Sequence, residues 1–145
     1  MNIVISAGTY LPARAVRELF ARNHWDYWLG EEDIKWYLAH AHFVATAWDD
    51  SQLVGLAVLV GDGRKYLELE NLLVDKAYRR QGIARKLMTQ VMQAIKRAQP
   101  YVVKIEVHEE TTEAFYREFG FIRNRSTWLL ELESGSESLR VTTRK

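Results

Sequence analysis

A short arginine-rich turn near the middle of the chain has the residue types of an anion-binding site. The turn contains Arg79, Arg80 and Gln81. Gly82 follows, and apolar residues recur with helical spacing from Ile83 onward. The first N–H groups of a helix lack partners within the helix, and the helix dipole makes that end positive. Glycine lets a bulky anion approach the backbone, and arginine adds charge and paired donors. The segment therefore predicts a phosphate-binding turn.

The spacing of this turn differs from two common phosphate motifs. No glycine is followed by Lys and then Ser or Thr, and the chain contains no G-x-G-x-x-G sequence. A single glycine between arginines also fits an ordinary solvated helix start. The fragment alone therefore leaves both interpretations open.

A second pattern follows the helix. A β-branched run at 102–107 comes first, and then Tyr116 stands four residues before the pair Gly120 and Phe121. A run of this kind predicts a strand, and the segment after it predicts a short helix.

The two patterns together resemble the GNAT superfamily of acetyl-CoA-dependent N-acetyltransferases. In that family a strand ends in a valine five residues before an Arg/Gln-x-x-Gly-x-Gly/Ala turn, as Val74 does before Arg79, Gly82 and Ala84. The resemblance covers 53 to about 133 well, and the first fifty residues only by the order of elements. It implies acetyl-CoA (coenzyme A) as the cofactor.

The resemblance and the element order predict the α/β GNAT fold. The expected mixed, mostly antiparallel central sheet has about six to seven strands and is flanked by about four helices. Residues 1–133 are expected to form a single acetyltransferase domain, and 134–145 a C-terminal tail or one extra edge strand. Expected strands lie at 2–6, 43–48, 53–60, 66–74, 102–107, 121–124 and 127–133. Expected helices begin at Pro12 and lie at 31–40, 83–98 and 111–119.

Composition restricts the class of protein. The net charge of +1 argues against nucleic acid as a partner, because proteins that bind the phosphates of a nucleic-acid backbone normally have a large excess of basic residues. The absence of cysteine excludes disulfides and thiolate nucleophiles and fits a reducing compartment. The longest apolar run, 53–60, is too short to cross a membrane, and the first residues do not resemble a signal peptide. We therefore expect a cytoplasmic protein without a membrane partner.

Two glutamates are candidates for the base that removes a proton from an amine. Glu70 lies on the strand that leads into the turn, where GNAT members often carry an acidic residue that works through water. Glu106 matches an acidic base in some peptide-acetylating members. Glu68 is expected on the same face as Glu70 and is a weaker candidate for the same role. Glu70 and Glu106 also have structural interpretations: Glu70 as a solvent-facing strand residue, and Glu106 as the partner of Lys104 or of an outer helix.

Tyr116 is the candidate acid for the leaving thiolate, because a phenol with a pKa near 10 suits that donation and the family helix carries a tyrosine at this position. The alternative is that Phe115, Tyr116 and Phe119 only pack the helix. The chain departs from the family in one place. Relatives usually have Asn seven residues before this tyrosine, where its amide contacts the cofactor arm. This chain has Glu109 there, which lacks the amide, and Thr111 or Thr112 is the alternative for this contact.

The resemblance also assigns residues to the cofactor. A backbone N–H in the stretch Leu72, Leu73 and Val74, where the family strand bulges, is expected to stabilise the thioester oxygen. The backbone of the same stretch is expected to pair with the pantetheine arm. The turn residues expected to bind the diphosphate are Arg79, Arg80, Gln81, Gly82, Ile83, Ala84 and Arg85.

The acceptor side is indicated by an aromatic cluster between the first two helices. Trp25, Tyr27 and Trp28 surround Asp26, and such a wall with one carboxylate suits an amine through packing and cation–π attraction. The same cluster also fits a homodimer contact or a small local core. The histidines show no metal-ligand spacing, so no metal is expected.

We therefore interpret the chain as an N-acetyltransferase that moves an acetyl group from acetyl-CoA to a primary amine of a small molecule. Attack is expected to be direct, in a ternary complex. Two alternatives stay open: a protein or peptide N-acetyltransferase acting on an N-terminus or a lysine, and a non-catalytic acyl-CoA-binding sensor.

Overall fold

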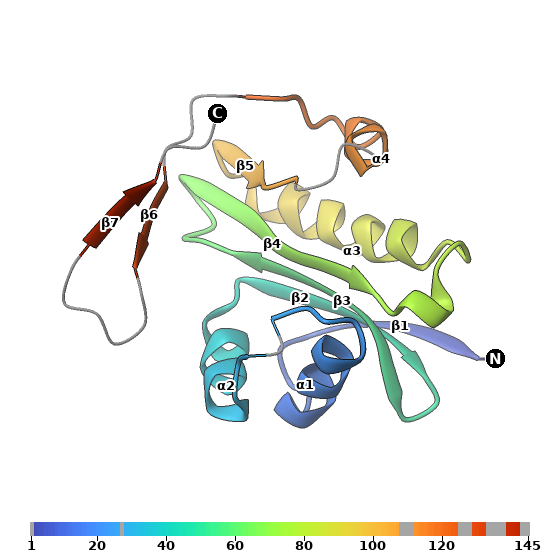
Figure 1. Ribbon diagram of the computed structural model, residues 1–145. Helices are drawn as coiled ribbons and strands as arrows, with labels where there is room; N and C mark the ends of the chain where they lie inside the picture. Colours follow the sequence, from blue (N-terminus) through green and yellow to red (C-terminus); the bar gives the residue numbers. More distant parts are fainter. Residues whose placement is uncertain (1, 27, 108–111, 125–128, 133–138, 143–145) are drawn as a thin grey trace. The chain divides into compact units, whose positions relative to one another are not determined.

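The computed structural model describes residues 2–26, 28–107, 112–124, 129–132 and 139–142 (Figure 1). The chain divides into two compact units, Met1–Glu106 and Val107–Lys145. The first unit contains the sheet and the turn identified in the sequence.

A five-stranded sheet in the order β1-β2-β3-β4-β5 forms the first unit (Figure 1). All neighbouring strands run antiparallel except β4 and β5, which are parallel. β3 is buried along almost its whole length because it is apolar on both faces and lies inside the sheet. The strands are β1 (Ile3–Ala7), β2 (Phe43–Asp49), β3 (Gln52–Val60), β4 (Tyr66–Val74) and β5 (Val102–Ile105).

Helices cover both faces of this sheet. α1 (Ala13–Arg22) and α2 (Glu31–His40) pack on one face, and α3 (Ile83–Ala98) packs on the other (Figure 1). A 3-10 helix, η1 (Lys76–Tyr78), lies between β4 and α3. The predicted bounds of α2, β4 and α3 are confirmed; α3 has the strongest local signals, an apolar stripe with Gly82 at its start and Pro100 after its end.

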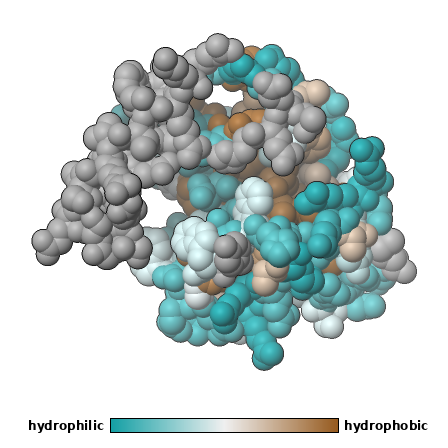
Figure 2. Space-filling model, viewed as in Figure 1, coloured by the Kyte–Doolittle hydropathy of each residue, from teal (hydrophilic) through white to brown (hydrophobic). Residues whose placement is uncertain are grey.

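The core between α1, α2 and the sheet is apolar. It contains Val16, Leu19, Phe20, Ile34, Leu38, Val44, Leu53, Leu56, Val58 and Leu73. Removing such side chains from water contributes about 1.5–3 kcal/mol each and fixes both helices on the sheet. Hydrophilic residues cover the outward surfaces of α1 and α2, at the bottom of the view in Figure 2.

α3 approaches the other face of the sheet closely at Gly55 of β3. A Cβ added at Gly55 would lie 3.1 Å from Leu87 Cδ1 of α3 and 3.1 Å from Ala47 Cβ of β2. Only glycine fits without displacing these neighbours.

The helices of the described part of the chain include none with the length and hydropathy that a membrane span needs.

The second unit contains α4 (Glu113–Arg117), β6 (Leu129–Leu132) and β7 (Leu139–Thr142). β6 and β7 form a separate two-stranded antiparallel sheet. The prediction of one sheet with six to seven strands is therefore wrong: the central sheet has five, because the last strands pair with each other.

The predicted strand at 121–124 is also wrong. Gly120 adopts a φ of 96° and reverses the chain after α4, so that the Phe121 N–H donates to the Tyr116 carbonyl at 3.3 Å. The Phe121 ring then packs edge-on against the Tyr116 ring, with centroids 6.1 Å apart. This segment therefore closes α4, and β6 finds its strand partner in the tail.

Candidate active site

β4 leaves β5 halfway along its length. The parallel pairing joins Tyr66 to Val102 at one end and Leu69 to Ile105 at the other. β4 nevertheless continues to Val74, paired only with β3. Within the part of the chain that the structure describes, the other backbone edge of β4 has no strand partner beyond Leu69. An extended ligand with amide groups can pair with such an edge.

A β-bulge lies at the point of divergence. Asn71 of β4 stands opposite Val58 of β3, whereas Leu69 stands opposite Leu59, so Glu70 is an extra residue without a counterpart. Bulges redirect side chains and occur beside active sites. The bulge therefore gives Glu70 a position that a regular strand would not provide.

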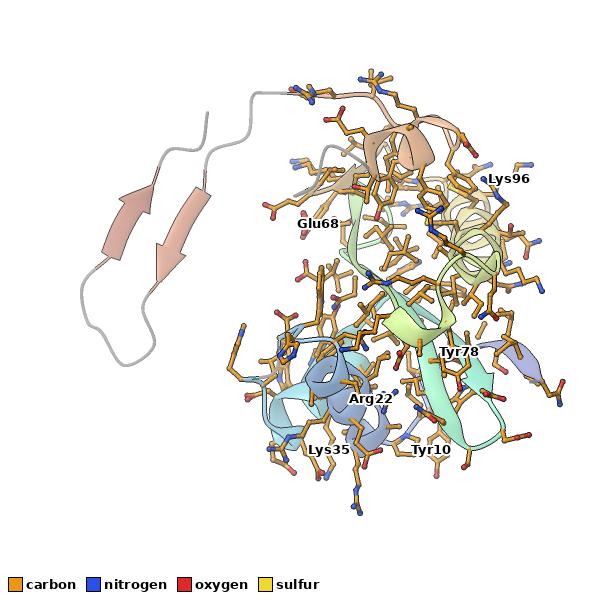
Figure 3. All side chains as sticks on the ribbon, turned by 45° about the vertical axis from the view of Figure 1, so that its right-hand side comes forward. Tyr10, Arg22, Lys35, Glu68, Tyr78 and Lys96 are labelled. Atoms are coloured by element: carbon orange, nitrogen blue, oxygen red, sulfur yellow. The ribbon has the colours of Figure 1, made fainter. Side chains whose placement is uncertain are left out.

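The bulge also changes which residues share a face of the sheet. Glu68 stands opposite Val60, and Asn71 stands opposite Val58. Val58 and Val60 both face α1 and α2, and opposed residues share a face, so Glu68 and Asn71 do too. In a regular strand residues three apart would lie on opposite faces. Figure 3 shows Glu68 toward the start of β4 and Tyr78 beyond its end.

The sequence interpretation expected the strand to bulge away from its neighbour at Leu72, Leu73 and Val74. The register shift with β3 lies at Glu70, and the pairing of β4 with β5 has ended before this stretch. These residues pair regularly with Ala57, Leu56 and Gly55 of β3. A bulge depends on the register between two strands, and three aliphatic residues carry no signal for it. The role of this stretch in binding the cofactor remains a prediction.

Carboxylates gather around Glu70. Glu70 is exposed as a whole residue, but partial burial of its carboxyl group is the largest cause that raises its pKa; the charges of Glu68, Asp26 and Glu106 add to the rise, as does a hydrogen bond with Glu68. The resulting pKa is about 7. A carboxyl group with this pKa is about half ionised at neutral pH, which suits a group that accepts and releases protons.

A chain of hydrogen bonds joins the aromatic cluster to β4. Trp25 Nε1 donates to Asn71 Oδ1 at 2.6 Å, and Asn71 Nδ2 donates to the Tyr37 hydroxyl at 2.8 Å. Asn71 is 3% exposed. Sequence reasoning selected Trp25 but missed Asn71 and Tyr37. The available signal was that Asn71 is polar, whereas the other residues at alternate positions of β4 with it are leucines, Leu67, Leu69 and Leu73.

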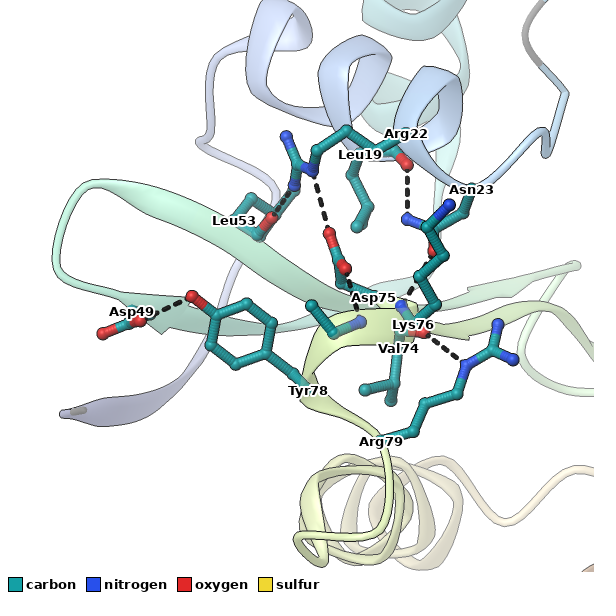
Figure 4. A network of polar contacts seen from close by, with 11 residues as sticks. Leu19, Arg22, Asn23, Asp49, Leu53, Val74, Asp75, Lys76, Tyr78 and Arg79 are labelled. Atoms are coloured by element: carbon teal, nitrogen blue, oxygen red, sulfur yellow. Dashed lines mark hydrogen bonds and ion pairs between the residues drawn. The ribbon is translucent and has the colours of Figure 1, made fainter.

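The turn after β4 has the geometry of an anion site. Gly82 caps α3 with a φ of 79°, and nothing lies within 4 Å of a Cβ added there. Lys86 N donates to the Gly82 carbonyl at 3.1 Å, so the helix is already formed at this residue. Arg79 Nε donates to the Val74 carbonyl at 3.2 Å, which holds this arginine against the end of β4 (Figure 4). Arg80 is exposed, with a φ of 62°.

An ion pair between the buried Asp75 and the partly exposed Arg22 fixes the start of the turn. Asp75, 3% exposed, accepts from Arg22 Nε at 2.8 Å and from Ala77 N at 2.9 Å (Figure 4). Arg22 Nη2 also donates to the Leu53 carbonyl at 2.6 Å. Burial alone would raise the pKa of Asp75, but the hydrogen bonds and charge of Arg22, with Ala77 N–H, lower it overall.

Three further hydrogen bonds support the turn. Lys76 N donates to Asn23 Oδ1 at 2.9 Å, and Asn23 Nδ2 donates to the Leu19 carbonyl at 2.8 Å. The Tyr78 hydroxyl donates to Asp49 Oδ2 at 2.6 Å. The turn is thus tied to the end of α1 and to the β2–β3 hairpin (Figure 4).

The Arg22–Asp75 pair is expected to contribute strongly to stability. Arg22→Met should lower the free energy of unfolding by about 2 kcal/mol at pH 7, because it leaves a buried carboxylate without its partner. The loss should shrink as pH falls below the usual pKa of Asp. The ion pair stabilises the protein only while the Asp75 carboxyl group is ionised. Urea denaturation at pH 7 and at lower pH measures the loss of stability and its dependence on pH. Arg14→Met, which removes the exposed Arg14–Glu18 pair, is the control.

The structure brings together part of the predicted site. Glu70, Glu106 and Trp25 belong to the first unit, around the bulge of β4. Trp28 is exposed, and Tyr27 lies outside the described residues. Tyr116 lies in the second unit, where burial raises its pKa. Glu109 lies outside the described residues.

Known proteins share this fold. The GNAT family acetyltransferase from Streptococcus pneumoniae TIGR4 is 30% identical over 83% of this chain and 88% of that one, with a TM-score of 0.72. A ribosomal-protein-alanine N-acetyltransferase from Brucella melitensis biovar Abortus 2308 is 15% identical over 90% and 100%, with a TM-score of 0.69. An aminoglycoside N-acetyltransferase in complex with CoA is 15% identical over 87% and 91%, with a TM-score of 0.66. These last two show the fold alone.

A family model provides the assignment. Among proteins with curated descriptions, no sequence is similar enough to count as a match. The family model described as Acetyltransferase (GNAT) family, however, matches residues 11–121 of this chain. The matched residues include β4, the turn and α3. The chain therefore belongs to the GNAT acetyltransferase family.

Proposed function

We propose that this protein transfers an acetyl group from acetyl-CoA to a primary amine of a small molecule, by direct attack of the neutral amine. The observation that carries the proposal is Glu70, a carboxyl group with a pKa of about 7 at the bulge where β4 leaves β5. Such a group can take a proton from an ammonium, whose pKa is normally near 10.

The residues around the turn fit acetyl-CoA. The open space at Gly82, the start of α3 and the side chain of Arg80 can receive a diphosphate. The edge of β4 at 72–74, which pairs with no second strand among the described residues, can hydrogen-bond to the amides of the pantetheine arm. When bound, acetyl-CoA supplies an acetyl group activated as a thioester.

The acceptor surface is negatively charged. The charges of Glu68 and Asp26 act on Glu70, and Trp25, next to Asp26 in the sequence, is hydrogen-bonded to Asn71, next to Glu70. Carboxylates and an aromatic ring together attract an ammonium group. We therefore place a cationic amine against Trp25, within reach of Glu70 directly or through water.

Tyr116 is proposed as the acid that protonates the leaving thiolate. Tyr116→Phe should lower kcat by about ten- to a thousandfold with little change in acetyl-CoA affinity, because the lost proton acts mainly in the transition state. Steady-state kinetics with a good acceptor, beside calorimetry with acetyl-CoA, measures both quantities. An unchanged kcat would leave Tyr116 as a packing residue of α4.

Release of free thiol from acetyl-CoA tests the proposed function. The assay compares small amines, polyamines, aminoglycosides and peptides, each against a blank without acceptor. We expect acceptor-dependent release with at least one small amine. Release with peptides alone would favour a protein N-acetyltransferase, and tight binding of acetyl-CoA without release would favour a sensor; either result overturns the small-molecule proposal.

A further inference from the structure

The buried amide of Asn71 connects three elements of the acceptor site. Asn71 belongs to the bulge of β4, Trp25 to the segment between α1 and α2, and Tyr37 to α2. Both hydrogen-bonding ends of the amide are used, toward Trp25 Nε1 and toward the Tyr37 hydroxyl. A buried amide with satisfied ends fixes the relative positions of the groups that it joins.

The partners of Asn71 determine its orientation. Trp25 Nε1 can only donate, so the amide oxygen must face it. The amide nitrogen therefore faces Tyr37 and donates to the hydroxyl oxygen. Because this hydroxyl accepts from Asn71, its own proton remains to be donated to another group.

The surroundings of Tyr37 keep that proton in place. Burial raises the pKa of Tyr37 most; the hydrogen bond from Asn71 opposes the rise, and the charges of Glu70, Asp26 and Glu68 add to it. Tyr37 is therefore a neutral donor at any pH at which an enzyme of this kind works. Its hydroxyl lies in the field of the same carboxylates that surround Glu70.

The backbone around Trp25 shows that its position needs support. His24 and Asp26 both adopt positive φ angles, of 51° and 40°. Each costs roughly 1 kcal/mol for a residue other than glycine, so contacts elsewhere must offset this strain. The bond from Trp25 to Asn71 is one such contact.

We propose that Asn71 is a positioning residue of the acceptor site, which holds the Trp25 indole and the Tyr37 hydroxyl beside Glu70 to orient the amine. Asn71 acts through these two side chains. The inference rests on the proposed function, because it assigns the residues that select and orient the acceptor of that reaction.

Two conservative variants test the two hydrogen bonds of the Asn71 side chain. Trp25→Phe and Tyr37→Phe each keep an aromatic ring and remove one hydrogen bond. Each should raise the KM for the amine about tenfold and leave the KM for acetyl-CoA unchanged. Asn71→Leu should raise the amine KM about a hundredfold, and adding Tyr37→Phe to it should have no further effect, because the contact is already lost.

Trp48→Phe is the matched control. It also removes an indole hydrogen bond to a side-chain oxygen, from Trp48 Nε1 to Thr46 Oγ1 at 3.0 Å, within β2. We expect it to leave the amine KM at the wild-type value. If Trp25→Phe and Tyr37→Phe keep the wild-type amine KM, or if Trp48→Phe raises it equally, the role of Asn71 is overturned.

Wild-type transfer is measured first, so that two failures can be distinguished. Absence of transfer to every amine would overturn the proposed function and this inference together. An active wild type with unaffected phenylalanine variants would overturn the inference alone. Should Asn71→Leu fail to fold, the two phenylalanine variants still decide the question.

Discussion

Gly82→Asp should lower the affinity for acetyl-CoA by about thirty- to a thousandfold, or about 2–4 kcal/mol. The new carboxylate would stand at the positive end of α3, in the open space that we assign to the diphosphate. Two negative groups cannot share this site without a large electrostatic cost. Isothermal titration calorimetry of the folded variant measures the affinity.

Gly82→Asn separates charge from bulk. Asparagine has nearly the shape of aspartate and also tolerates a positive φ, which is 79° here. We expect a loss of affinity clearly smaller than that of the aspartate variant. If both variants fold and bind acetyl-CoA as tightly as the wild type does, the diphosphate lies elsewhere.

Glu70→Gln should lower kcat/KM by about a hundredfold or more at pH 7, while acetyl-CoA affinity stays unchanged. Glutamine keeps the shape of the side chain but cannot accept the amine proton. For the wild type, kcat/KM should rise with pH through about 7, the pKa of Glu70, and rise further as neutral amine becomes available. The variant should lose the step near 7 and recover part of its activity at high pH.

The same substitution should also change stability with a defined sign. The pKa of Glu70 is raised in the folded protein, so its contribution is fully present below pH 4.5 and is lost as pH rises through about 7. Above pH 7, Glu70→Gln should therefore be more stable than the wild type, by about 1 kcal/mol after allowance for the partial exposure of the side chain.

Glu106→Gln is the matched comparison. Its charge also raises the pKa of Glu70, so its removal should move the midpoint of the pH profile downward without removing the step. A Glu70→Gln enzyme with the wild-type rate at pH 7 contradicts the assignment. Glu106 would then be the next candidate base.

The sequence predicted most elements of the first unit because their periodicity is local. α3 combines an apolar stripe with Gly82 at its start and Pro100 after its end, and its bounds were predicted correctly. β5 was expected at 102–107 but ends at Ile105, where its pairing with β4 stops. The end of a strand depends on its partner, which the sequence of one strand does not contain.

The site was predictable only in part. Glu70 and the turn lie within motifs of fixed spacing, so the sequence selected them. The bulge depends on how β4 is aligned with β3, and the contacts of Asn71 join residues 34 and 46 positions apart. Such contacts exist only after folding, and the one trace of them in β4 was a polar residue, Asn71, among the alternate positions that are otherwise leucine.

The most direct test of the central claim is a mass balance in a single reaction. CoA released and N-acetylated amine formed are quantified together, and the intact mass of the protein is followed during turnover. We predict one acetylated amine for each CoA released and no acetyl group on the protein. CoA release without acetylated amine, or an acetyl-protein that forms and decays at the rate of turnover, would contradict direct transfer.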